Sequence, residues 1–210
     1  MPELKDEPLI ALFAAPFISH LWTDSEALNR ELKDKILAQE RDHPQRSVSL
    51  SNVGGWHSDT GDLAFCGEAG ITLCRRMKEM GDVATAKLFA EQGKPDPRFG
   101  WFLEAWANVN RAGDFNRVHF HGLYTWSGTY YVDAGDPENP NVGTALELTD
   151  PNQARAGNFL PGHLPTSALI RPQPGLMVLF PSYVPHMVFP HKGASPRISI
   201  GFNLRKDPYP

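Results

Sequence analysis

Three histidines have a spacing that suits a metal site. His119 and His121 are separated by one residue, and His186 follows a proline-bounded turn at the start of a short apolar run. Side chains alternate across a strand, so His119 and His121 are expected on one face, with Val118 and Phe120 on the other. If a barrel brings His186 beside this pair, three imidazoles form a facial site with other positions open for substrate and oxygen. The alternative is that all three are separate structural histidines.

Other residues are weaker candidates for metal ligands. Asp114 and Asp133 could supply a carboxylate, but neither has the one-residue spacing from His119. The remaining histidines have no partner at such spacing and are expected to be surface or loop residues: His20, His43, His57, His163 and His191.

A second pattern predicts an anion site near the first. Arg197 and Ser199 alternate within RISIGFN, so they share one face of a strand, and Gly201 and Asn203 continue that face. An arginine that points into an apolar barrel is costly unless it meets an anion, and its planar guanidinium suits a carboxylate. The competing interpretation is a surface ion pair at a strand edge, which does not explain Ser199.

These blocks, taken together and in order, resemble the 2OG-Fe(II) oxygenase family. The similarity covers residues 101–205, and the first half matches more loosely through SNVGGWHS. It implies that iron(II) and 2-oxoglutarate are the cofactors. By position, His119 and His186 match the ligand histidines, while Arg197 and Ser199 match the pair that binds the distal carboxylate of 2-oxoglutarate. Tyr131 matches a tyrosine that donates a hydrogen bond to the same carboxylate. Asn108 is a candidate contact for the other end of 2-oxoglutarate.

One position departs from the wider superfamily. The usual triad is two histidines and a carboxylate, whereas His121 stands at the carboxylate position. The narrower family shares this histidine, so the resemblance implies a metal set of His119, His121 and His186. The implied reaction uses dioxygen, hydroxylates an unidentified substrate and releases succinate and carbon dioxide.

Two other functions remain open at this point. A cupin-type metal enzyme without a keto-acid cosubstrate shares the barrel and the His-x-His pattern, but residues 122–126 lack the glutamate that usually follows. A non-catalytic metal- or ligand-binding barrel is the second alternative.

The first half of the chain is expected to form helices that support a barrel. The opening apolar segment reads as a strand or extended chain, and Thr23 and Glu26 have the spacing of a capping box. Leu28, Leu32 and Ile36 then recur as one buried helical face. An ordered loop should follow near residues 47–62, and two further helices are expected over 63–80 and 82–91.

The second half is expected to form strands. Eight short runs rich in β-branched and aromatic residues follow Phe99, punctuated by Gly, Pro, Asn and Asp. The expected fold is mainly β with α: a double-stranded β-helix (jelly-roll, cupin-like) barrel buttressed by N-terminal helices. We expect a single oxygenase domain over residues 1–210, with a mostly helical support region at 1–98 and the β-helix core at 99–206.

Composition limits the partners. The net charge of −4 gives no basic surface for nucleic acid and no polybasic membrane patch. The acidic start lacks the plan of a signal peptide and no apolar run is long enough for a bilayer, so a cytoplasmic protein is expected. Cys66 and Cys74 are expected to be reduced thiols. Exposed edge strands often pair, which makes a homodimer one expectation.

Overall fold

The computed structural model describes residues 14–47, 50–97, 100–136, 145–152 and 165–207. Fifteen elements follow one another within these ranges. In order, they are β1 (Ile18–Leu21), α1 (Glu26–Asp42), η2 (Pro44–Arg46), β2 (Asn52–Val53), β3 (Trp56–His57), η3 (Ala64–Cys66), α2 (Gly67–Glu91), β4 (Trp101–Asn110), β5 (Phe115–His119), β6 (Trp126–Asp133), β7 (Leu146–Thr149), β8 (Ser167–Ile170), β9 (Leu176–Pro181), β10 (His186–Val188) and β11 (Arg197–Lys206).

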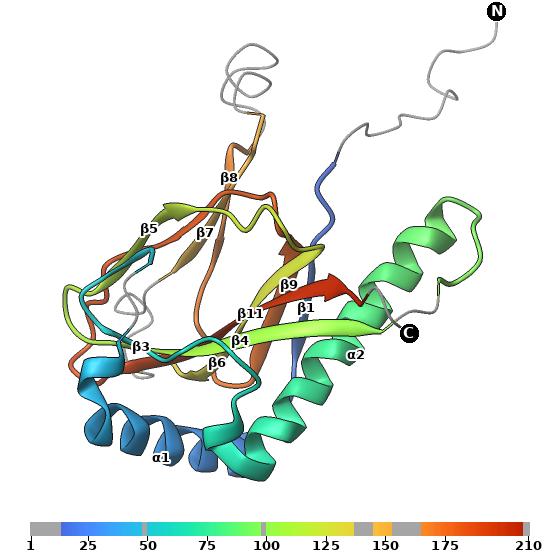
Figure 1. Cartoon of the computed structure of the whole chain (residues 1–210). Helices are drawn as coiled ribbons and strands as arrows, with labels where there is room; N and C mark the ends of the chain where they lie inside the picture. The colour runs from blue at the N-terminus through green and yellow to red at the C-terminus, as the bar shows by residue number, and fades with distance from the viewer. Residues whose placement is uncertain (1–13, 48–49, 98–99, 137–144, 153–164, 208–210) are drawn as a thin grey trace, which may run out of the picture.

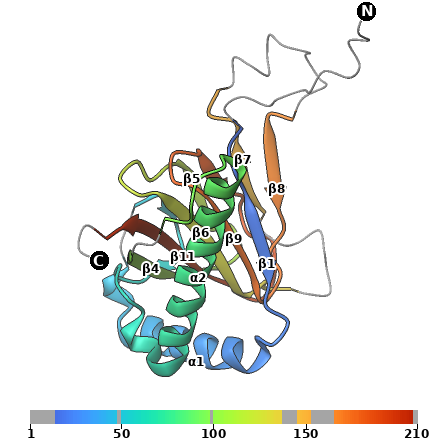
Figure 2. The same ribbon diagram turned by 90° about the vertical axis from the view of Figure 1, so that its right-hand side faces the viewer.

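Two antiparallel sheets face each other. The major sheet has the order β1-β9-β6-β11-β4-β3, and the minor sheet has the order β2-β5-β10-β7-β8. Both helices lie on the outer side of the major sheet, and the minor sheet lies on its other side (Figures 1 and 2). This is the double-stranded β-helix that the sequence predicts, with helices buttressing one sheet.

Strand alternation divides the major sheet into two chemically different faces. On β11, Ile198, Ile200, Phe202 and Leu204 are fully buried in the cluster that packs against the helices. The residues between them, starting with Arg197, face the other sheet and line a cavity. The apolar face therefore stabilises the fold, while the opposite face is free to carry polar groups.

Helix α2 runs without interruption where the sequence predicts two helices. The predicted break falls at Gly81, which lies in the middle of the helix and is buried. A Cβ added there would lie 2.6 Å from Cδ1 of Leu204, so glycine lets the helix approach the major sheet closely. The next residue, Asp82, accepts a 2.7 Å hydrogen bond from Nε1 of Trp101. Glycine serves close packing here and does not end the helix.

Two other expectations change at the N-terminal side, and a third, the strand or extended chain before α1, is confirmed. Helix α1 has Ser25 as its N-cap, with no side-chain capping bond, so the predicted capping box at Thr23 is wrong. The segment expected to be a loop contains the strands β2 and β3, which add one strand to each sheet. The extended segment before α1 includes β1, which pairs with β9 at the edge of the major sheet (Figure 2). The first half therefore contributes strands as well as helices.

The eight expected runs after Phe99 all contain strands, β4 to β11. Cys66 and Cys74 are free cysteines, as expected. No helix within the described ranges is long and apolar enough to cross a membrane.

Candidate active site

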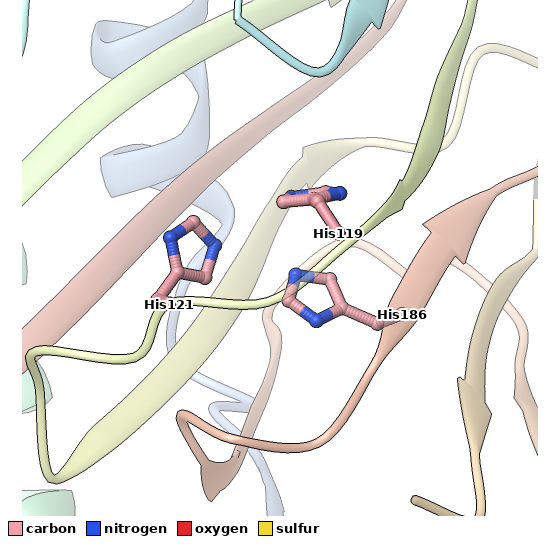
Figure 3. A group of neighbouring side chains, drawn as sticks. All are labelled: His119, His121 and His186. Atoms are coloured by element: carbon pink, nitrogen blue, oxygen red, sulfur yellow. The ribbon is translucent and has the colours of Figure 1, made fainter.

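Strands β5 and β10 of the minor sheet bring the three histidines together. His119 ends β5 and is paired in register with His186, the first residue of β10. His121 follows two residues after His119, and its ring turns toward the other two (Figure 3). Each ring has one nitrogen atom that lies within 4.8 Å of a nitrogen atom of both other rings. Val118 and Phe120, which alternate with the two histidines in sequence, are 62% and 63% exposed and line the same cavity.

Backbone carbonyls fix the orientation of two of the rings. Nδ1 of His119 lies 2.7 Å from the carbonyl oxygen of Arg117, and Nδ1 of His186 lies 2.9 Å from that of Val184. A carbonyl can only accept, so each Nδ1 carries the proton and each Nε2 keeps its lone pair. Nε2 of His186 is therefore available as a metal ligand. Nε2 of His119 accepts a 3.3 Å hydrogen bond from the hydroxyl of Ser51, a contact that a bound metal would replace.

Burial keeps the three imidazoles neutral. Burial is the main cause that lowers the pKa of His121 to about 4 and that of His186 to about 3, and neighbouring histidines lower both further. Burial also lowers the pKa of His119. Metal binding requires the neutral ring, so protons compete little with a metal near neutral pH. The donor set suits iron(II), although imidazoles alone also suit zinc, copper and nickel.

Arg197 lies on β11, opposite the histidines across the same cavity. Its side chain is 2% exposed, and it donates hydrogen bonds of 3.2 Å to Oδ1 of Asn110 and to Oγ of Ser199. Its guanidinium carbon lies 5.6 Å from the ring centre of Tyr131. Among the described residues, neither Nε of Arg197 nor the hydroxyl of Tyr131 has a hydrogen-bond partner. Two buried polar groups thus lie side by side, and among the described residues these two atoms have no acceptor outside the pair.

Burial acts on the pKa values of both groups. It lowers the pKa of Arg197 and raises that of Tyr131 to about 12, although the guanidinium charge opposes this rise. Arginine stays protonated even when buried. The tyrosine is neutral, so the pair offers one positive charge and several donors, which match the needs of a carboxylate.

The cavity between the sheets has a volume of about 610 Å³, and all three histidines line it. Arg197, Ser199 and Asn108 also line it, as the sequence predicts. Tyr131 is fully buried beside Arg197 and is paired with Ser199 in register. Asn108 lies opposite Ser199 on β4, at the same level of the sheet. This volume is within the usual range for a small-molecule site.

The two candidate aspartate ligands lie outside the histidine cluster. Oδ2 of Asp133 forms a 2.6 Å ion pair with Nζ of Lys33 on α1. Oδ2 of Asp114 accepts a 2.7 Å hydrogen bond from the backbone of Arg111. Among the described residues, neither carboxylate lies close enough to join the histidine cluster. The candidate set is therefore three imidazoles without a carboxylate.

Sequence reasoning missed several residues of the cavity. His57 was expected at the surface, but it is 2% exposed, lines the cavity and stacks on Trp106 with ring centres 5.7 Å apart. His191, expected as a surface or loop residue, lies in a loop and is 1% exposed. His20 is exposed and His43 is partly exposed, while His163 lies outside the described residues.

A periodic signal could have found some of these residues. Glu104, Trp106, Asn108 and Asn110 occupy alternate positions of β4, in phase with Arg197 and Ser199 on β11. Gly201 lies opposite Trp106, where an added Cβ would be 2.7 Å from the indole ring. A glycine at this position leaves room for the indole to form the cavity wall.

Comparison with known proteins agrees with this geometry. Residues 104–203 match the model of the family described as "Putative 2OG-Fe(II) oxygenase". The chain belongs to the 2OG-Fe(II) oxygenases. It is therefore an oxidoreductase, and its family uses iron(II), 2-oxoglutarate and dioxygen. No curated protein matches the chain.

Solved structures share the fold at low sequence identity. A prolyl-4-hydroxylase from Pseudomonas putida is 18% identical, with a TM-score of 0.65 over 92% of this chain and 94% of that one. A prolyl hydroxylase from Trichoplax adhaerens, solved with a hypoxia-inducible-factor peptide, is 15% identical, with a TM-score of 0.60 over 90% and 83%. The alpha-ketoglutarate-dependent carbocyclase SnoK of nogalamycin biosynthesis is 12% identical, with a TM-score of 0.61 over 91% and 80%. At these identities the likeness establishes the double-stranded β-helix fold of this oxygenase.

Proposed function

We propose that this oxygenase holds iron(II) through His119, His121 and His186, binds 2-oxoglutarate against Arg197, and hydroxylates a separate substrate. The observation that carries the proposal is one cavity with a cluster of neutral imidazoles on one sheet and a buried guanidinium on the other. A keto acid with a distal carboxylate is a ligand that both sites can bind at once.

The described residues fit the metal. Imidazole nitrogens are good ligands for iron(II), and two of the three rings present an Nε2 lone pair fixed by a backbone carbonyl. When bound, the metal would supply the activation of dioxygen that couples decarboxylation of 2-oxoglutarate to oxidation of the substrate. The protein contributes ligand orientation, a site for each reactant and exclusion of water.

The residues around Arg197 fit the distal carboxylate of 2-oxoglutarate. Nε of Arg197 and the hydroxyl of Tyr131 are buried donors for which the described part of the chain supplies no acceptor outside the pair. Ser199 and Asn110 hold the two terminal nitrogens of the guanidinium, so its plane is fixed before the ligand arrives. Preorganised donors lose little conformational entropy on binding, which increases affinity. Asn108 pairs with Ser199, two positions along β11 from Arg197 in the direction of Asn203, which contacts His121. It is proposed to contact the keto-acid end of 2-oxoglutarate.

The substrate is proposed to enter past an apolar rim. Leu50, Val118 and Phe120 line the cavity and are between 62% and 65% exposed. The structural relatives include prolyl hydroxylases and a carbocyclase, so the shared fold does not select a substrate. Balance of the proposed reaction requires one dioxygen and one 2-oxoglutarate for each hydroxyl group formed, with succinate and carbon dioxide released.

The decisive experiment is anaerobic addition of iron(II) and 2-oxoglutarate, followed by visible absorption. We expect a charge-transfer band that requires both components and disappears in His186→Gln. A keto-acid titration also separates this function from a metal enzyme without a cosubstrate. Absence of the band in the wild-type protein, with bound iron verified by metal analysis, would contradict the proposal.

A further inference from the structure

The three histidines differ in what holds the nitrogen that faces away from the cluster. His119 and His186 each place Nδ1 against a backbone carbonyl. Within the described ranges no backbone carbonyl holds His121 in this way, and its Nδ1 lies 3.5 Å from Nδ2 of Asn203 on β11. The backbone of His121 is anchored, because its N–H donates a 2.8 Å hydrogen bond to the carbonyl of Ser182. Its ring therefore depends on a side chain from the opposite sheet.

Asn203 is itself held in place. It is 3% exposed and is paired in register with Ser127 of β6, which is 2% exposed. The hydroxyl of Ser127 lies 2.7 Å from Oδ1 of Asn203, so the plane of the amide is fixed. A buried amide with one end on a hydroxyl and the other end facing an imidazole can influence which ring nitrogen carries the proton.

The amide can take two orientations that differ by exchange of its nitrogen and oxygen. If Nδ2 donates to Nδ1 of His121, the proton must sit on Nε2, and that nitrogen cannot bind a metal. If Oδ1 accepts from Nδ1–H, Nε2 has a lone pair, as in the other two histidines. Ser127 permits both, because a hydroxyl donates to Oδ1 in the first case and accepts from Nδ2 in the second.

We propose that Asn203, held by Ser127, positions His121 for metal binding by accepting the hydrogen of Nδ1. Asn203 is a positioning residue that acts through His121 and does not touch the metal itself. The pair takes the role that backbone carbonyls take for His119 and His186. This inference rests on the proposed three-histidine site, so the experiment must test the two separately.

The test is titration of the metal-free protein with Co(II), followed by visible absorption and competition with a chromophoric chelator. Asn203→Leu removes the acceptor at similar size, and we expect Co(II) affinity to fall about 10- to 100-fold. Asn203→Asp retains an acceptor, and affinity should stay within about threefold of wild type or increase. Ser127→Ala should weaken binding by about three- to tenfold.

A matched control comes from another buried asparagine. Asn29 on α1 accepts a 2.6 Å hydrogen bond from the hydroxyl of Tyr130 on the helix-facing side of the sheet. Asn29→Leu should lower Tm without changing Co(II) affinity. Nitrogen-15 spectra of the Zn(II)-loaded protein provide a second readout, because the Nδ1–H signal of His121 should be present in the wild type and exchange with water faster in Asn203→Leu.

Each outcome decides one claim. If His121→Ala binds Co(II) as well as the wild type, the three-histidine site is wrong. If His121→Ala loses affinity while Asn203→Leu and Asn203→Asp both match the wild type, only the positioning role is overturned. If Asn203→Leu does not fold, Ser127→Ala decides, and a loss of less than about threefold in that variant overturns the inference.

Discussion

Arg197→Met should separate cosubstrate binding from folding stability. Methionine is a long, unbranched side chain that fills similar space without charge. The guanidinium is 2% exposed, its Nε has no hydrogen-bond partner, and burial lowers its pKa. Removing a buried charge that lacks an anion removes a desolvation cost. We therefore expect the metal-free, ligand-free variant to have a Tm equal to or above that of the wild type.

The same substitution should greatly weaken 2-oxoglutarate binding. A charge-assisted hydrogen bond contributes about 1.5–3 kcal/mol, so loss of two such bonds costs about 3–6 kcal/mol. That difference corresponds to an increase of about 100- to 10,000-fold in Kd. Metal content should stay nearly unchanged, because Arg197 lies on the sheet opposite the histidines.

The assay is calorimetric titration of 2-oxoglutarate into Zn(II)-loaded protein, which binds without turnover. At 100 times Kd, 2-oxoglutarate should stabilise the wild type by about 2.7 kcal/mol, or about 5–10 °C in Tm, and leave the variant unchanged. Arg117→Met is the matched control, because Arg117 is exposed where it lines the same cavity. A Kd for Arg197→Met within threefold of the wild type would refute the anchor role. An apoprotein Tm several degrees lower would refute the argument about the unpaired charge.

Three further predictions follow from the cavity. Tyr131→Phe removes a buried hydroxyl that has no partner, so the free protein should keep its Tm while the Kd for 2-oxoglutarate rises about 3- to 30-fold, measured by the same titration. Gly201→Ala places a Cβ 2.7 Å from the ring of Trp106, so thermal melts should show destabilisation and indole fluorescence should change; an unaltered emission spectrum would contradict the predicted clash. The pKa values of His121 and His186 in the folded state lie below the unfolded value near 6.5. Below that pH the unfolded chain binds more protons than the folded one, so acid favours unfolding. Urea melts of the apoprotein should therefore show stability falling from about pH 6.5 toward pH 4. His186→Gln should flatten this pH dependence.

The sequence alone predicted the class of the fold and the main residues that lie together at the candidate site. Strand alternation depends only on backbone geometry, so the spacing of Arg197 and Ser199 was enough to place both on one face of β11. His121 follows the end of β5, so the tertiary structure turns its ring toward the other two histidines. The eight strand-forming runs and the helical first half follow from local residue preferences in the same way. The order of the motifs then indicated the family, which the family match confirms.

Only the tertiary structure decided which residues meet across the sheets. His57 is ordinary in sequence, and for Asn203 the sequence predicts only that it shares the face of Arg197. Both become parts of the site because β3 and β11 face the minor sheet. Gly81 predicted a helix end, but its contact with Leu204, distant in sequence, favours a continuous helix. Such contacts depend on how sheets and helices pack, and local periodicity carries no information about the partner on the other side.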